Sequence, residues 1–186
     1  MRIIAGRWKG ARLASPAGTA TRPTTDRVKE SVFSILGHHV DNARVLDLCA
    51  GTGNLGLEAL SRGAESAVFV EKSGRAVALI RENCEKVRAG NVRIVRKDAI
   101  RFIRNWDNAQ EPFTLVFFDP PYGGGLYQGV LEAVGQSPIL REGGIIVVEH
   151  GRDQSLHEMY QGLATIDNRR YGDTQITLLR QKEVNQ

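Results

Sequence analysis

The sequence contains no apolar run that approaches the roughly 18 residues of a membrane-spanning helix. Its first residues also lack the apolar core and small-residue cleavage site of a secretory signal. Cysteine is scarce, because Cys49 and Cys84 are the only two among 186 residues. This scarcity argues against a disulfide framework or a cysteine-rich metal site. We therefore expect reduced thiols, a cytoplasmic location, no membrane association and no metal.

Internal repeats, low-complexity tracts and dividing linkers are also missing. The hydrophobic fraction of 41% and the charged fraction of 25% are ordinary for a globular protein. A chain of this length can bury a sizeable core. We predict one domain over residues 1–186, with no feature that requires an oligomer, so a monomer is expected.

Positive charge is concentrated at one end of the chain. Residues 1–29 hold seven Lys and Arg against Asp26 alone, whereas the rest holds 18 basic and 20 acidic residues. This asymmetry predicts a polyanionic partner for the N-terminal end. Trp8 lies among these cations, as is typical of nucleic-acid binders. We predict that residues 1–23 form a basic hairpin or arm, and a solvated, disordered tail is the less favoured alternative.

Beyond the arm, helical and strand patterns alternate. Strands are predicted at residues 44–48, 66–70, 92–95, 113–118 and 145–149, and a closing hairpin at 164–169 and 175–180. Helices are predicted from about Thr24 to Leu36 and at residues 54–62, 73–89, 99–106 and 126–135. Repeated βα units predict a mostly parallel sheet with helices on both faces, to which the hairpin adds an antiparallel strand.

A glycine motif lies between the first strand and the following helix. Gly51, Gly53 and Gly56 match Gly-x-Gly-x-x-Gly, a spacing that allows a tight turn and close approach of a ligand. Glu71 ends the next strand, 20 residues after Gly51, where it can accept hydrogen bonds from ribose hydroxyls. Asp98 follows the third strand and could contact an adenine amine or cap a helix. The motif predicts a nucleoside cofactor.

A second motif, Asp119-Pro120-Pro121-Tyr122, follows an apolar strand. Proline has no N–H, so this turn can present carbonyl oxygens without competing donors. Asp119 adds an anionic acceptor, and Tyr122 offers a flat face for a nucleobase. The motif is suited to holding a planar amine, although a proline-rich strand ending is the simpler interpretation.

Two nucleoside cofactors compete for the glycine motif. A nicotinamide dinucleotide would place its pyrophosphate at the helix N-terminus, where the carboxylate of Asp47 would repel it. S-adenosylmethionine has no phosphate, and its methionine amino group would make Asp47 useful. Methyl transfer to an amine also explains the Asp119 turn, which hydride transfer does not. The residues therefore favour an S-adenosylmethionine-dependent methyltransferase.

The chain resembles the bacterial 16S ribosomal RNA guanine-N2 methyltransferases over nearly its whole length. The resemblance is carried by residues 2–10, 22–30, 47–56 and 119–122 and by the turn at 171–174. It implies an α/β fold of the class I (Rossmann-like) methyltransferase type, with one antiparallel strand and an N-terminal basic β-hairpin. It also implies S-adenosylmethionine as cofactor and a guanine of the small ribosomal subunit as substrate.

The residue analysis and the resemblance together define three groups of candidate residues. The cofactor group is Arg22, Thr24, Asp47, Ala50, Gly51, Thr52, Gly53, Glu71, Lys72, Asp98 and Ala99. The catalytic group is Asp119, Pro120, Pro121 and Tyr122. The RNA-binding group is Arg2, Arg7, Trp8, Lys9 and Arg12. A DNA adenine or protein glutamine methyltransferase, a nicotinamide-dependent oxidoreductase and a non-catalytic RNA-binding module remain as alternatives.

Overall fold

The computed structural model describes residues 1–16, 26–121 and 125–182. The predictions for Arg22, Thr24 and Tyr122 lie outside these residues. In chain order the elements are α1 (Asp26–Leu36), η1 (Gly37–Val40), β1 (Arg44–Leu48), α2 (Asn54–Ser61), β2 (Ser66–Glu71), α3 (Gly74–Lys86), β3 (Val92–Arg96), α4 (Ala99–Arg104), β4 (Phe113–Phe118), α5 (Leu126–Gly135), β5 (Leu140–Gly151), β6 (Met159–Tyr160), β7 (Leu163–Tyr171) and β8 (Thr174–Gln181).

All eight described strands belong to one sheet, in the order β3-β2-β1-β4-β5-β8-β7-β6. The first five in this order pair in parallel, and β8 pairs antiparallel with both β5 and β7. β8 is the antiparallel strand expected from the closing hairpin. The two-residue strand β6, which pairs antiparallel with β7 at the edge of the sheet, was not predicted.

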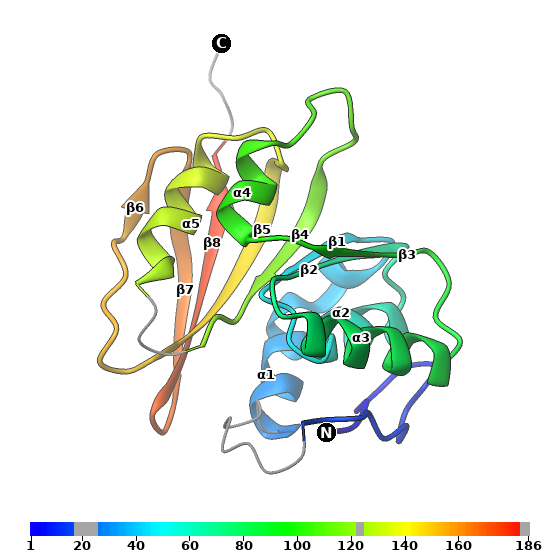
Figure 1. The fold of residues 1–186 in the computed structure, drawn as a ribbon. Coiled ribbons are helices and arrows are strands. Elements are labelled where there is room, and N and C mark those ends of the chain that lie inside the picture. Colours follow the sequence, from blue (N-terminus) through cyan, green and yellow to red (C-terminus); the bar gives the residue numbers. More distant parts are fainter. Residues whose placement is uncertain (17–25, 122–124, 183–186) are drawn as a thin grey trace.

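The sheet is covered on both faces, as predicted (Figure 1). α1, α2 and α3 pack with alternate strand residues such as Val45 and Phe117 into one core. α4 and α5 pack with the intervening residues, such as Leu46 and Val116, into a second core on the opposite face. Burial of the parallel strands on both faces explains why β4 is apolar along nearly its whole length.

The predicted element types are confirmed, and most differences concern boundaries. β5 begins at Leu140, five residues before the predicted start at Ile145. The glycines at 143 and 144 and the charged residues before them masked this first part of the strand, which passes through an irregularity in its pairing with β4. α3 and α4 end three and two residues before their predicted ends, respectively.

The N-terminal arm is a hairpin that packs on α2. Arg2 and Arg12 form an isolated antiparallel bridge, and Ile3 exchanges backbone hydrogen bonds with Ala11 and Gly10. Ile3 is fully buried in the core that contains α1 and α2. The hairpin prediction is therefore confirmed for residues 1–13, and the solvated-tail interpretation does not hold for them.

No helix among the described residues combines the length and apolar character needed to cross a membrane. The two cysteines are free, as expected: Cys84 is buried and Cys49 is half-buried. Within the described part of the chain, no cluster of three or more His, Cys, Asp or Glu side chains could hold a metal ion.

Candidate cofactor and substrate site

The two sequence motifs meet at the carboxyl edge of the parallel strands. β1 lies between β2 and β4, and Leu48 is in register with Val70 on one side and Phe118 on the other. The glycine loop that follows β1 and the turn at Asp119 that follows β4 therefore leave the sheet from neighbouring strands. Ligands of open α/β sheets bind at this edge, so the arrangement supports one composite site.

Two glycines of the loop have backbone conformations that favour glycine. Gly51 and Gly53 have φ angles of 56° and 76°, in the left-handed region that other residues rarely adopt. The third glycine has a packing role, because a Cβ on Gly56 would lie 2.4 Å from the ring of Phe69. The loop thus turns sharply into α2 and holds that helix tightly against β2.

Glu71 holds the loop in place from the end of β2. Its carboxylate accepts hydrogen bonds from the backbone N–H groups of Gly51, at 3.0 Å, and Ser73, at 2.8 Å. The side chain is 9% exposed, so a small part of it reaches the surface of the site. Each carboxylate oxygen keeps further acceptor capacity, which suits the predicted bond to ribose hydroxyls.

Asp47 lies underneath the loop. The residue is 2% exposed, and its Oδ2 accepts a hydrogen bond of 2.9 Å from the N–H of Gly56 in α2. Burial raises the pKa of Asp47 to about 8, against the lowering effect of the Gly56 hydrogen bond, and the charge of Glu71 raises it further. In this position Asp47 shapes the cofactor loop from below, a role that the sequence analysis did not anticipate.

The raised pKa predicts a pH dependence of stability that Asp47→Asn removes. The folded carboxyl keeps its proton up to about pH 8, whereas the unfolded one releases it near its ordinary value of 3.8. The folded state therefore binds more protons between these values, and the free energy of unfolding falls as the pH rises through this window. Urea unfolding across the window should show a steeper fall for the native chain than for the variant. Identical slopes would contradict the protonated state of Asp47.

The other predicted cofactor residues surround the same edge. Asp98 accepts a hydrogen bond from the N–H of Arg101 and caps α4, so its capping role is present in the structure. Ala50, Thr52 and Ala99 are buried, and Lys72 is exposed beyond the end of β2. These residues line up along the ends of β1, β2 and β3, as a nucleoside lying across those strands would require.

Asn83 of α3 is a site-supporting residue that sequence reasoning missed. Its Nδ2 donates to the carbonyl oxygen of Thr52 in the cofactor loop, at 2.9 Å, and to that of Ala14. Its Oδ1 accepts from the N–H of Ala14, at 2.6 Å. The residue is fully buried. An Asn among the apolar positions of a helix face was the available signal, because a buried amide requires partners.

The turn after β4 places Asp119 beside the glycine loop. Asp119 is half-buried, Pro120 is buried and Pro121 is exposed. Burial raises the pKa of the Cys49 thiol to about 12, and the charges of Glu71, Asp47 and Asp119 add to this effect. Several carboxyl groups therefore surround Cys49, the first residue after β1. The edge is electronegative, which suits a cationic sulfonium ligand and an amine.

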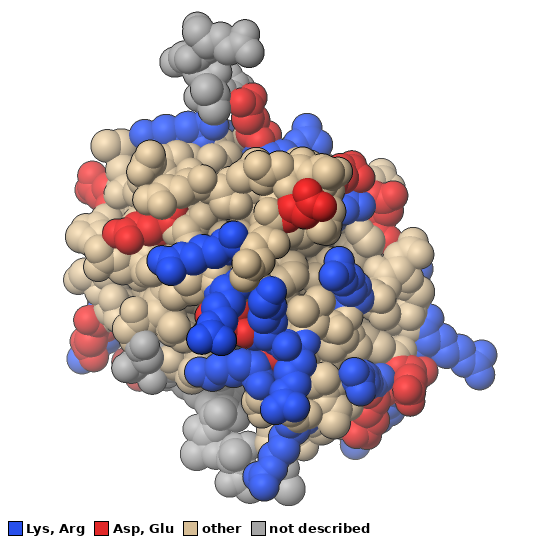
Figure 2. Space-filling view, turned by 45° about the horizontal axis from the view of Figure 1, so that its top comes forward, with Lys and Arg blue, Asp and Glu red and all other residues tan. Residues whose placement is uncertain are grey.

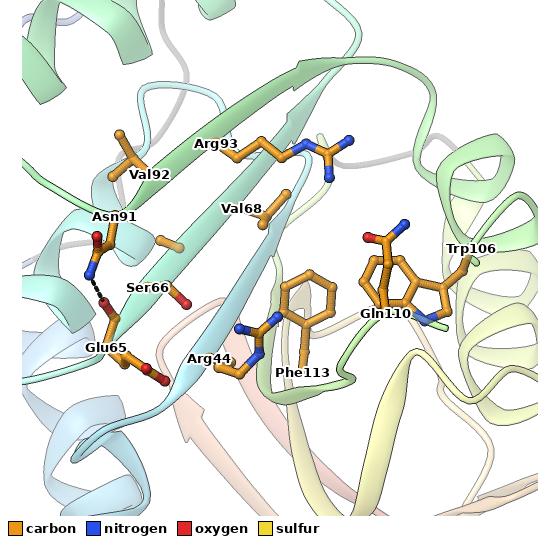
Figure 3. A pocket seen from close by; sticks show the side chains of 11 residues that line it. Arg44, Glu65, Ser66, Val68, Asn91, Val92, Arg93, Trp106, Gln110 and Phe113 are labelled. Atoms are coloured by element: carbon orange, nitrogen blue, oxygen red, sulfur yellow. Dashed lines mark hydrogen bonds between the residues drawn. The ribbon is translucent and has the colours of Figure 1, made fainter. Parts of the chain in front are cut away.

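A groove of about 400 Å³ lies at the opposite, amino edge of the same strands (Figure 3). It is bounded by the strand starts and the segment before β4, with Arg44, Arg93 and Phe113 around the hollow. None of the predicted cofactor or catalytic residues lines it. The groove is therefore separate from the candidate site.

Residues 1–180 match the model of a protein family described as "Conserved hypothetical protein 95". The chain belongs to this family. Among its relatives, a Bacillus subtilis protein named "Putative rRNA methyltransferase YlbH" is 37% identical over 98% of this chain and 100% of the relative. The Escherichia coli protein "Ribosomal RNA small subunit methyltransferase D" is 36% identical over 89% of this chain and 79% of its own length.

Solved structures agree with this family assignment. The "Putative methyltransferase yhhF from Escherichia coli" superposes with a TM-score of 0.86 at 31% identity, over 98% of both chains. A Thermus protein, "TTHA0928", gives a TM-score of 0.83 at 32% identity over 99% of both chains. The fold is thus the class I methyltransferase fold, which is consistent with the nucleoside cofactor expected from the glycine loop. The family match and the named relatives confirm the resemblance to ribosomal RNA methyltransferases that the sequence suggested.

Proposed function

We propose that the protein transfers a methyl group from S-adenosylmethionine to the exocyclic N2 amine of one guanine in 16S ribosomal RNA. The observation that carries the proposal is the turn at Asp119 and Pro120, which leaves β4 directly beside the glycine loop that follows β1. The names of the relatives support ribosomal RNA as the substrate class. We further propose that residues 1–186 act as one cytoplasmic, monomeric domain.

The cofactor contributes an electrophilic methyl group on a sulfonium. The glycine loop and Glu71 offer backbone and carboxylate groups to its nucleoside, above the buried Asp47. Gly51 fits this role, because a Cβ at this position would approach no atom closer than 4.0 Å and the space beside its backbone is open. The negative charges at this edge favour a cationic ligand over a pyrophosphate, which distinguishes the proposal from a nicotinamide-dependent oxidoreductase.

The protein residues act mainly on the amine. The lone pair of the guanine amine is delocalised into the ring, which makes it a poor nucleophile. Flipping the base out of the RNA helix brings the amine to the turn. There Asp119 and the Pro120 carbonyl oxygen each accept a hydrogen bond from one of its two N–H groups. Such bonds favour a more tetrahedral nitrogen, whose lone pair would bond to the methyl carbon as the carbon–sulfur bond breaks and the sulfonium becomes a neutral thioether. Asp119 would stabilise the positive charge on nitrogen until the nitrogen releases one proton to solvent. In this proposal Tyr122 stacks on the base.

The direct test is incubation of the protein with labelled S-adenosylmethionine and small ribosomal subunits that lack the modification. Label should enter 16S RNA at one nucleotide, and digestion should release N2-methylguanosine. Deproteinised 16S RNA, DNA and protein substrates are tested in parallel. Label in adenine of DNA or in glutamine would contradict the proposal and support the corresponding alternative.

The hairpin predicts a second result for RNA binding. Replacing Arg7, Trp8 and Lys9 by Ala should weaken RNA binding and lower the slope of log affinity against log salt by about 1.4–1.8, because two cations are removed and each phosphate contact contributes about 0.7–0.9. The hairpin should stay docked, since Arg7 and Trp8 bond to Ser61 of α2 through their backbone N–H groups. Filter binding at several salt concentrations measures the slope. Unchanged RNA affinity would show that the hairpin does not contact the substrate.

A further inference from the structure

A second group of cations lies at the carboxyl edge, far from the N-terminal hairpin in sequence. Residues 96–101 contain Arg96, Lys97 and Arg101 against Asp98 alone. β3 lies next to β2 in the sheet, so the cations at the end of β3 lie near those that follow β2. We call this group the β3–α4 basic surface; its residues are Arg75, Arg96, Lys97 and Arg101, and it lies next to Lys72 of the candidate cofactor group. All are exposed except Lys97, which is half-buried.

The strand order brings these residues together. Arg96 reaches across to β2, where its Nε lies 3.5 Å from the carbonyl oxygen of Lys72. The guanidinium carbon of Arg96 would lie 3.3 Å from a Cβ on Gly74, the first residue of α3. Figure 2 shows Lys and Arg side chains gathered at the centre of the face onto which the ends of β2 and β3 open. Like charges held this close favour an anionic partner.

The two acidic residues at the ends of β2 and β3, Glu71 and Asp98, accept hydrogen bonds from backbone N–H groups. Both carboxylate oxygens of Glu71 accept backbone N–H groups, and the residue is buried. Asp98 caps α4 through the N–H of Arg101. Within the described ranges, no carboxylate forms an ion pair with any residue of the β3–α4 basic surface. The charge of this surface is therefore left for a partner.

The surface lies beside the proposed reaction site. From Asp119 the strand order runs through β1 and β2 to β3, which is three strand spacings or about 14 Å. One strand of a nucleic-acid helix carries a phosphate every 3.4 Å or so along its axis. A strand whose target base enters at Asp119 can therefore reach the surface with its next few phosphates.

We propose that the β3–α4 basic surface binds the phosphate backbone of the substrate RNA next to the methylated nucleotide. This inference rests on the proposed function, and it adds a second RNA contact to that of the hairpin. RNA is the partner because the surface lies on the same edge of the sheet as Asp119, where the target base would bind. The partner is a continuous polyanion, and its contacts are phosphate contacts that carry no sequence information.

The test compares two triple variants of the full chain. Arg75→Gln, Arg96→Gln and Arg101→Gln remove three charges from the surface. Arg81→Gln, Lys86→Gln and Arg88→Gln remove three from exposed positions in the C-terminal half of α3 and just after it, as a matched control. Binding to unmodified small subunits is measured at several salt concentrations. The surface variant should lose about 10–100-fold in affinity, and its salt slope should fall by about 2–3. The control should match the native chain.

Two further measurements separate the possible outcomes. Calorimetry with S-adenosylhomocysteine should give equal affinities for all three proteins, which shows that the cofactor site is intact. A photo-crosslinker at position 101 should attach to 16S RNA near the methylated nucleotide. Attachment to a ribosomal protein, or an equal loss in the control variant, would overturn the inference while leaving the proposed function standing. If the native chain neither binds nor methylates the subunit, both fall.

Discussion

Replacing Asp119 by Ala should reduce methyl transfer by about 10³-fold or more while cofactor affinity stays within about twofold of the native value. The carboxylate is the only charged group of the Asp119-Pro120-Pro121-Tyr122 turn, and in the proposed mechanism it accepts a hydrogen bond from the amine and stabilises the cation that forms on nitrogen. The groups that hold the glycine loop, Glu71 and Asp47, make no contact that requires Asp119. The loss should therefore fall on turnover rather than on cofactor binding.

Single-turnover methylation at saturating cofactor measures this effect, and calorimetry with S-adenosylhomocysteine measures binding. Asp119→Asn keeps an acceptor but loses the charge, so it should retain more activity than Asp119→Ala. Asp153→Ala removes a carboxylate that is 92% exposed and serves as the control. Near-native turnover by Asp119→Ala would exclude the proposed role of the turn.

Replacing Glu58 by Ala should destabilise the fold by about 3–5 kcal/mol, because it breaks a fully buried charge network. Glu58 of α2 is 0% exposed and accepts hydrogen bonds from the N–H groups of Ile4 and Ala5 in the hairpin. It also pairs with Lys29 of α1 at 3.1 Å and with Arg62 at 2.7 Å. Removing it would leave a buried ammonium and two backbone donors without their acceptor.

Lys29 is the buried cation of this network, and its partners explain why losing Glu58 should be costly. Burial lowers the pKa of Lys29, and the charge and hydrogen bond of Glu58 oppose that shift. The ammonium also donates to the carbonyl oxygen of Arg2, at 2.6 Å, and to Oδ1 of Asn54, at 2.8 Å. The network therefore joins the hairpin, α1 and the first residue of α2 after the glycine loop.

Thermal unfolding checks this prediction. A loss of about 3–5 kcal/mol corresponds to a fall in Tm of roughly 10 °C for a chain of this size. Glu85→Ala removes an exposed glutamate from α3 and should have little effect. If uncompensated charge is the cause, Glu58→Leu combined with Lys29→Met should be less destabilised than Glu58→Ala alone. A Tm shift of only a degree or two for Glu58→Ala would contradict the network's role.

Much of the fold was predictable because its signals are local. β1 to β4 and their helices follow hydrophobic periodicity, and their ends carry glycine or a capping residue such as Ser73. The carboxyl-edge position of Glu71 and Asp119 then follows from parallel strand order alone. β6 has only two residues, too few for a periodic signal, and its pairing with β7 depends on the chain having already folded.

The second basic group was hidden for a different reason. The chain beyond residue 29 is slightly acidic in total, which concealed a local excess of cations at β3 and α4. Arg96 and Lys72 are 24 residues apart, and only the pairing of β2 with β3 brings them together. Likewise, Lys29 and Glu58 are charged residues on helix patterns, and nothing in their spacing reveals that they are buried partners.

Local sequence signals specify the element order, the glycine loop, the carboxylate at the end of β2 and the proline turn after β4, because each depends on residues close together in the chain. The tertiary structure alone decided that Asp47 lies under the loop, that Asn83 and Glu58 tie the hairpin to the cofactor side, and that cations gather beside the site. These depend on burial and on neighbours across the sheet, and solvation energies of buried polar groups are set only once the strands and helices have packed.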